Sequence, residues 1–160
     1  MRRIKKFDDY LNGVSKTSNI NSGRSFIIQG KDANKLASSL LGFMKTQGVS
    51  FKNGSEPVIK FTREKQGETP FFRETGHYIG VKNEITIYTK GRSLKDCLRS
   101  LSHELIHADQ NINKGIDIMK ASDGIYGKSE EAEEIERDAY ERGNLIFRKW
   151  EESLRNNMEE

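Results

Sequence analysis

Apolar positions along the chain change their period several times, and each change marks a predicted element. Residues 25–30, SFIIQG, form a short apolar run ending in glycine, which is typical of a strand. In residues 31–48, apolar side chains recur three or four positions apart and predict a helix that packs through one face. The members of this stripe are Ala33, Leu36, Leu40, Leu41 and Met44. The folded part is therefore expected to begin with a strand followed by a helix.

The middle of the chain changes to β-branched and aromatic residues. Residues 57–63, PVIKFTR, predict one strand, and residues 66–70, QGETP, predict a turn region. Residues 77–90, HYIGVKNEITIYTK, predict two strands on either side of a turn at Lys82 and Asn83. These segments indicate a small sheet.

The second half of the chain returns to helical spacing. Ser93 followed by Asp96 predicts a capping box at the start of a helix that runs to about Asn111. Residues 111–128 contain three glycines and keep no period, so they predict a loop. A last long helix is predicted over about 129–154. Together the elements predict an α+β fold with a small twisted sheet.

Length and composition favour one compact unit. A chain of 160 residues suits a single domain, which we place at residues 25–155. Residues 1–24 are expected to form a flexible arm, with a possible short helix from Arg3 to Leu11 and then a polar stretch. No apolar run approaches the roughly 18 residues of a transmembrane helix, and no apolar signal region follows the basic N-terminus. We therefore expect a cytoplasmic protein that does not act in a membrane.

The charge argues against nucleic acid as a main partner, and the single cysteine argues against a disulfide. The net charge is only +3 and the basic residues are scattered, so nucleic acid is an unlikely partner that only the basic arm would contact. Cys97 is the single cysteine, which excludes an internal disulfide, and its leucine-rich surroundings favour a small buried side chain over a reactive thiol.

The segment HELIH, residues 103–107, is the strongest chemical signal. His103 and His107 are two of the three histidines in the chain, and their spacing places both on one face of a helix. In metallopeptidases this pair binds zinc, and the glutamate between them, here Glu104, acts as general base. An ordinary exposed helix face is the alternative. A separate stripe would anchor the helix, and it consists of Leu94, Leu98, Leu101 and Leu105.

A catalytic zinc site needs a third protein ligand, and the last helix supplies the candidates. They are Glu130, Glu131, Glu133, Glu134, Glu136 and Glu141. Helical steps from Glu136 reach Ala139, Gly143 and further apolar positions, whereas steps from Glu134 meet mostly charged ones. A carboxylate on a packed face is costly unless it is paired or binds metal. We therefore favour Glu136 as the third ligand and keep Glu134 as the alternative.

The motif and the last helix together resemble the gluzincin metallopeptidases, and more specifically small, often phage-encoded members. In these, HExxHxxQ precedes a helix with ExxA and a small residue one turn later. The matching residues are His103, Glu104, His107, Gln110, Glu136, Ala139 and Gly143. The resemblance covers roughly residues 76–150. Thermolysin-like members instead carry ExxxD, which Glu134 and Asp138 would satisfy.

This resemblance implies a minimal zincin-like fold, with the HExxH helix and a C-terminal glutamate helix beside the sheet. It implies one Zn²⁺ per chain bound by His103, His107 and Glu136, with Glu104 as general base. The expected reaction is hydrolysis of a protein or peptide substrate, as an endopeptidase rather than an exopeptidase, in a bacterial or phage-infected cytoplasm. The alternative is a non-catalytic zinc-binding protein of a virion or assembly, or a nucleic-acid-associated module.

For several polar residues near the motif, two roles are possible from the sequence. Gln110 and Asn111 lie on or near the histidine face and are candidates for contacts with substrate or with a ligand. Asp138 would either orient a ligand histidine or form a surface salt bridge with an arginine. Tyr140 could stabilise an oxyanion, but its place on the apolar stripe favours packing.

Two features upstream of the motif also allow more than one role. His77 is expected to be a half-exposed strand residue rather than part of a cleft. The strand in residues 84–90, EITIYTK, is either purely structural or the edge strand that binds an extended peptide.

Overall fold

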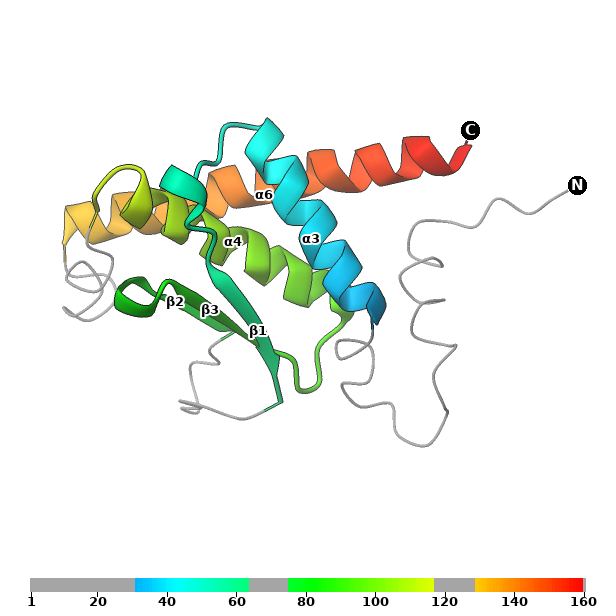
Figure 1. Ribbon diagram of the computed structural model, residues 1–160, viewed down its shortest axis with the longest axis horizontal. Coiled ribbons are helices and arrows are strands. Elements are labelled where there is room, and N and C mark those ends of the chain that lie inside the picture. The colour runs from blue at the N-terminus through cyan, green and yellow to red at the C-terminus, as the bar shows by residue number, and fades with distance from the viewer. Residues whose placement is uncertain (1–30, 64–74, 117–128, 160) are drawn as a thin grey trace, which may run out of the picture.

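The computed structural model describes residues 31–63, 75–116 and 129–159 (Figure 1). The predicted arm at 1–24 and the predicted strand at 25–30 lie outside the described residues, as does most of the predicted loop at 111–128. Within the described ranges the chain is α+β, with three α-helices and one mixed three-stranded sheet.

The sheet contains β1 (Val58–Thr62), β2 (Gly76–Ile79) and β3 (Glu84–Tyr88) in the order β1-β3-β2. β1 runs parallel to β3, and β2 runs antiparallel to it. The 3-10 turn η2 (Gly80–Lys82) joins β2 to β3 and ends at Asn83, whose φ of 48° lies in the left-handed region that asparagine tolerates better than most residues. The two strands predicted around this turn are therefore confirmed.

The central position of β3 decides between the two roles left open for this strand. Its backbone pairs with β1 on one side and with β2 on the other, so it cannot accept a peptide as an edge strand. Sequence could not show this, because strand order depends on pairings between distant segments. Within the described ranges, the edge strand nearest the histidine helix is β2.

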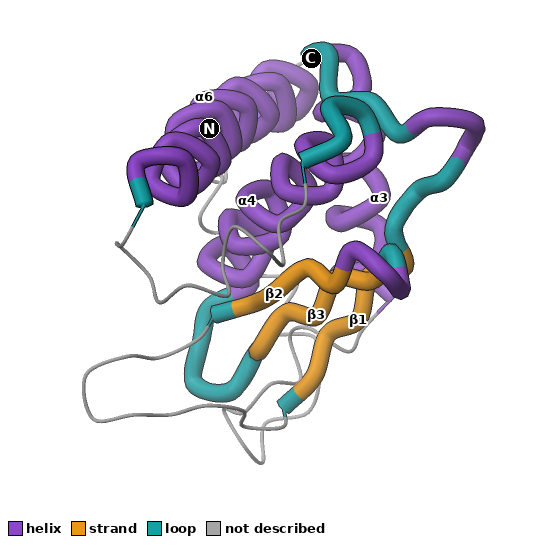
Figure 2. The backbone as a smooth tube through the Cα atoms, turned by 90° about the vertical axis from the view of Figure 1, so that its left-hand side faces the viewer, coloured by secondary structure: helices purple, strands orange, loops and turns teal. Residues whose placement is uncertain are grey.

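The helices lie on one face of the sheet, as Figure 2 shows. α4 (Leu94–Ile112) contacts the sheet on one side and α6 (Glu130–Glu159) on the other, while α3 (Lys31–Thr46) packs across α4 (Figures 1 and 2). A second 3-10 turn, η1 (Lys52–Gly54), lies between α3 and β1. α4 is therefore the central helix of the described structure.

The helix boundaries follow local capping signals. The Ser93 hydroxyl accepts a hydrogen bond from the Asp96 amide at 3.1 Å, so the predicted start of α4 is confirmed. The Ser129 hydroxyl accepts from the Ala132 amide at 3.1 Å at the start of α6. α6 continues to Glu159, five residues beyond the predicted end at 154.

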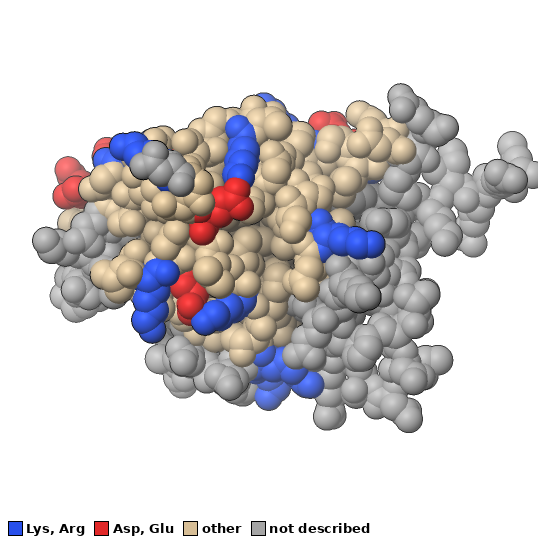
Figure 3. All heavy atoms as spheres, in the orientation of Figure 1, with Lys and Arg blue, Asp and Glu red and all other residues tan. Residues whose placement is uncertain are grey.

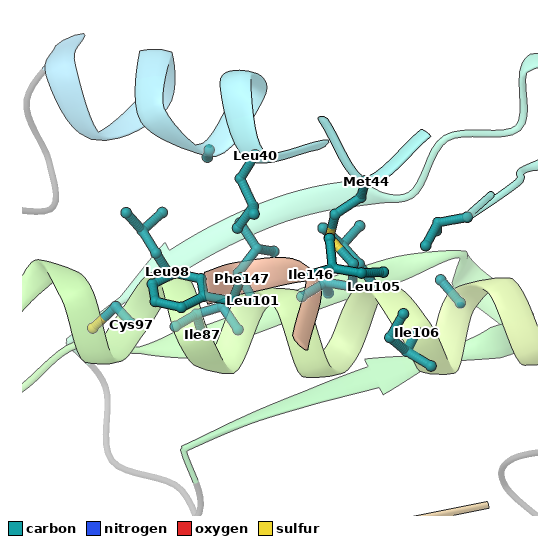
Figure 4. Packing of buried hydrophobic residues seen from close by; sticks show 14 of the residues in the cluster. Leu40, Met44, Ile87, Cys97, Leu98, Leu101, Leu105, Ile106, Ile146 and Phe147 are labelled. Carbon is teal, nitrogen blue, oxygen red and sulfur yellow. The ribbon is translucent and has the colours of Figure 1, made fainter. Parts of the chain in front are cut away.

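The hydrophobic core lies where α3, α4, α6 and the sheet meet (Figure 4). The leucine stripe of α4 is buried as predicted, and Phe147 and Trp150 of α6 pack into the same cluster. Each large apolar side chain removed from water contributes about 1.5–3 kcal/mol. Cys97 is also buried, and burial raises the pKa of its thiol to about 11, which agrees with a small unreactive core residue.

The surface bears charges of both signs. On the face shown in Figure 3, lysine and arginine side chains stand apart from one another and do not gather into one patch. Of the helices in the described ranges, none combines the length and the apolar character needed to span a bilayer.

Candidate metal centre

One side of α4 presents two histidines that stand one helical turn apart. The Nε2 atoms of His103 and His107 lie 3.1 Å from each other, and the rings meet edge to face at 86°. His107 is buried and His103 is half-buried. Because residues four apart on a helix project from one face, both imidazoles direct the same ring nitrogen to a common point.

α6 brings a carboxylate to this point. Glu136 Oε2 lies 3.3 Å from His103 Nε2, and Glu136 Oε1 lies 3.2 Å from His107 Nε2. Glu134, the alternative ligand, has a side chain that is 72% exposed and lies 3.8 Å from Arg137. Among the residues that the structure describes, His103, His107 and Glu136 form the one group whose donor atoms could share an ion.

The donor set fits zinc. The Nε2 atoms of the two histidines lie 3.1 Å apart, and each faces a different oxygen of Glu136, at 3.3 Å for His103 and 3.2 Å for His107. One donor atom from each of the three residues lies within 4.8 Å of the other two. Two imidazoles and one glutamate are also a ligand set that catalytic zinc sites use.

Small residues allow α6 to approach α4 closely beside the ligands. A Cβ atom at Gly143 would lie 3.3 Å from the Cα atom of His103, and the Ser102 hydroxyl donates to the Gly143 carbonyl at 2.7 Å. Ala139 is buried in the same interface. The expectation that Gly143 lets the helices approach closely is confirmed.

Glu104 is buried beside the cluster, with 6% of its surface exposed. Gly76 of β2 lies against it, because a Cβ atom at that position would be 3.4 Å from Glu104 Cγ and 2.8 Å from Ile87 Cδ1. A larger residue at position 76 would displace one of these side chains. Sequence reasoning missed Gly76, since no local pattern links it to the motif helix.

Burial and mutual interaction shift the protonation of the cluster. Burial disfavours ionised Glu136, but hydrogen bonds from His103 and His107 outweigh it and lower the pKa of Glu136 to about 2. Burial likewise disfavours charged His107, yet the hydrogen bond with Glu136 and the charge of Glu104 raise its pKa overall. Burial raises the pKa of Glu104, against the opposing charges of the two histidines. A carboxylate with a raised pKa is better matched to proton transfer near neutral pH.

Gln110 and Asn111 have different surroundings. Gln110 is buried, and its Oε1 atom lies 2.8 Å from His107 Nδ1. Asn111 accepts a hydrogen bond from the Tyr78 hydroxyl at 3.2 Å and donates to the Ile116 carbonyl at 2.9 Å. Gln110 therefore contacts a predicted ligand, whereas Asn111 holds the turn after α4 against β2.

Tyr140 and His77 lie at different distances from the histidine pair. The expected packing of Tyr140 is wrong, because its side chain is 66% exposed and its ring stands edge-on to His103 with centroids 5.6 Å apart. Ala139 faces α4, and the next residue of a helix is rotated by about 100° away from that face. His77 is half-buried on β2, with Nδ1 3.1 Å from the Tyr88 hydroxyl, and it does not join the ligand cluster.

Asp138 forms the arginine salt bridge that was one of its two predicted roles, and it contacts Gln110 rather than a histidine. It accepts hydrogen bonds from Arg142 and from Gln110 Nε2, the latter at 2.8 Å. These interactions outweigh partial burial and lower the pKa of Asp138. It therefore forms an arginine salt bridge and also reaches His107 indirectly, through Gln110.

No family model matches the chain, and neither a curated protein nor a solved structure does. The site consists of three residues whose donor atoms could share an ion, with a buried carboxylate next to them.

Proposed function

We propose that this protein is a zinc-dependent metallopeptidase with a minimal zincin-like fold of the gluzincin type. One observation carries the proposal: the donor atoms of His103, His107 and Glu136 converge at 3.1–3.3 Å, with Glu104 buried beside them. A purely structural zinc site has no need of this fourth residue, whereas peptide hydrolysis requires a base.

The residues would divide the work between binding and proton transfer. His103, His107 and Glu136 would hold the zinc ion, which when bound polarises a carbonyl group and lowers the pKa of water. The Glu104 carboxylate would take the proton from the attacking water and then deliver it to the nitrogen of the leaving amine. The burial of Glu104 directly beside the donor residues supports this assignment.

An extended peptide is the substrate class that the sheet favours. β2 is the edge strand of the described sheet that lies nearest α4, and Gly76 at its start lies against Glu104. A substrate that added to β2 through main-chain hydrogen bonds would pass alongside the base. This supports cleavage within a chain rather than at its end.

The direct test compares wild type with Glu104→Gln after loading with zinc. We expect the variant to keep about one zinc per chain and to cleave a peptide library at least about 100-fold more slowly, because the three ligands remain and the base is lost. Cleavage products are quantified by mass spectrometry. Glu134→Gln is the matched control, because it makes the same change at an exposed position of α6 and should leave the rate unchanged.

Cleavage by Glu104→Gln at the wild-type rate would overturn the mechanism. A wild-type protein that binds zinc but cleaves no member of the library would favour the non-catalytic alternative.

A further inference from the structure

Gln110 occupies an unusual position for a polar side chain, because it is 1% exposed and sits between the two ligand-bearing helices. Its Nε2 atom donates to the Ile135 carbonyl at 3.0 Å and to Asp138 Oδ2 at 2.8 Å. Its Oε1 atom lies 2.8 Å from His107 Nδ1. One amide thus connects a ligand histidine of α4 to the residue that immediately precedes the ligand Glu136 on α6.

These contacts fix the orientation of the amide. Both N–H groups of Gln110 have acceptors on α6, so the oxygen faces His107. An amide oxygen can only accept a hydrogen bond, and Nδ1 of His107 must therefore carry the proton. In the neutral ring, Nε2 then has a free lone pair, and Nε2 is the atom that faces His103 and Glu136.

A second layer of ion pairs holds Asp138, which accepts a hydrogen bond from the Gln110 amide nitrogen. Arg142 donates to both carboxylate oxygens of Asp138, at 3.1 and 2.9 Å, and to Asp109 Oδ2 at 2.7 Å. Asp109 belongs to α4, is 1% exposed and also accepts from the Ser50 amide at 3.0 Å. Gln110 and Arg142 therefore each join α4 to α6.

We propose that Gln110 is the positioning residue of the metal centre: it holds His107 with Nε2 towards the ion and locks the turn of α6 that carries Glu136. Asp138 and Arg142 serve the site by keeping the Gln110 amide in one orientation. The inference rests on the proposed zinc site and deepens it. It assigns to a neutral amide the support that metal-bound histidines commonly receive from a carboxylate or a backbone carbonyl.

The first test measures the zinc dissociation constant of Gln110→Leu by competition with a chelator. We expect zinc to bind about 10–100-fold more weakly, since His107 loses its acceptor and the turn of α6 loses its tie to α4. Asn111→Leu is the matched control, because it removes a neighbouring amide with two hydrogen bonds that do not reach a histidine. We expect that control to stay within about twofold of wild type.

A second measurement needs no variant and so does not depend on the folding of Gln110→Leu. In ¹⁵N-labelled, zinc-loaded wild type, the ring shifts of His107 should show Nε2 as the metal-bound nitrogen and Nδ1 as protonated. An Nδ1–H resonance protected from exchange should accompany them.

The two proposals fail in different ways. Zinc binding by Gln110→Leu at wild-type affinity, or coordination through Nδ1 of His107, would overturn the role of Gln110 and leave the zinc site intact. Absence of zinc binding by the wild-type protein would overturn the site itself, and this inference with it.

Discussion

Two sides of α4 are buried by side chains of opposite chemistry. On the side that meets α3 and the sheet, Leu98, Leu101 and Leu105 have no exposed surface. On the side that meets α6, His107 and Gln110 are 4% and 1% exposed, and they are held by hydrogen bonds, which depend on direction as well as distance.

The two sides therefore contribute differently: one mainly to the free energy of folding, the other to the relative placement of α4 and α6. Apolar burial depends on area and tolerates changes of shape at modest cost, so the leucine side mainly contributes free energy. Buried polar groups cost free energy unless each finds a partner, so the histidine side stabilises one relative placement of α4 and α6 and penalises others. The proposed metal site requires this fixed placement, because its candidate ligands come from both helices.

The largest effect should come from the apolar side. Leu101→Ala is expected to lower the free energy of unfolding by about 2–5 kcal/mol, because Leu101 is completely buried and its truncation leaves a cavity. Zinc content per folded chain should stay at the wild-type value. Urea unfolding and elemental analysis measure the two quantities, and loss of zinc from the folded variant would show that the two sides are not separable.

A rise in pH should strengthen zinc binding and weaken the stability of the zinc-free protein, because both depend on His107. The pKa of His107 is raised in the folded protein, so without zinc its contribution to stability is present at low pH and is lost as the pH rises through that pKa. Zinc requires the unprotonated ring, so below that pKa its affinity should fall about tenfold per pH unit for each proton displaced.

Chelator competition and urea unfolding between about pH 8 and pH 6 follow both trends, over the range where histidine titrates. Leu101→Ala should show the same slopes as wild type. A zinc affinity that does not vary over this interval would contradict the assignment of His107 as a ligand.

The smallest effect should come from Gly143→Ala, at the contact between the helices. The added Cβ would lie 3.3 Å from the His103 backbone, which must move by a few tenths of an ångström, so zinc affinity should fall by a factor of about 3–10. Gly42→Ala on α3 is the matched control, because its Cβ would meet nothing within 4 Å. We expect the control to keep zinc affinity and to gain up to about 1 kcal/mol of stability.

A Gly143→Ala protein with unchanged zinc affinity would show that the spacing of the helices does not limit the site.

The features that could be predicted from the sequence are those that the periodicity of a single element specifies. Helical spacing identified the leucine stripe, the histidine pair and the face of Glu136, because each depends on one helix only. The central position of β3 and the exposure of Tyr140 were not predicted, since they depend on strand order and on the rotation of α6 against α4. The bonds from Gln110 to Asp138 and from Arg142 to Asp109 span 28 and 33 residues, and no local pattern specifies such pairs.

The most direct test of the central claim is zinc content per chain by elemental analysis, for wild type, Glu136→Gln and Glu134→Gln after the same mild chelator wash. We predict about one zinc in wild type and in Glu134→Gln, and a selective loss in Glu136→Gln, since a three-residue site then has only two ligands. Equal zinc in all three proteins, or loss with Glu134→Gln alone, would contradict the site formed by α4 and α6. No zinc in any of them, even after addition of the metal, would make HELIH an ordinary helix face.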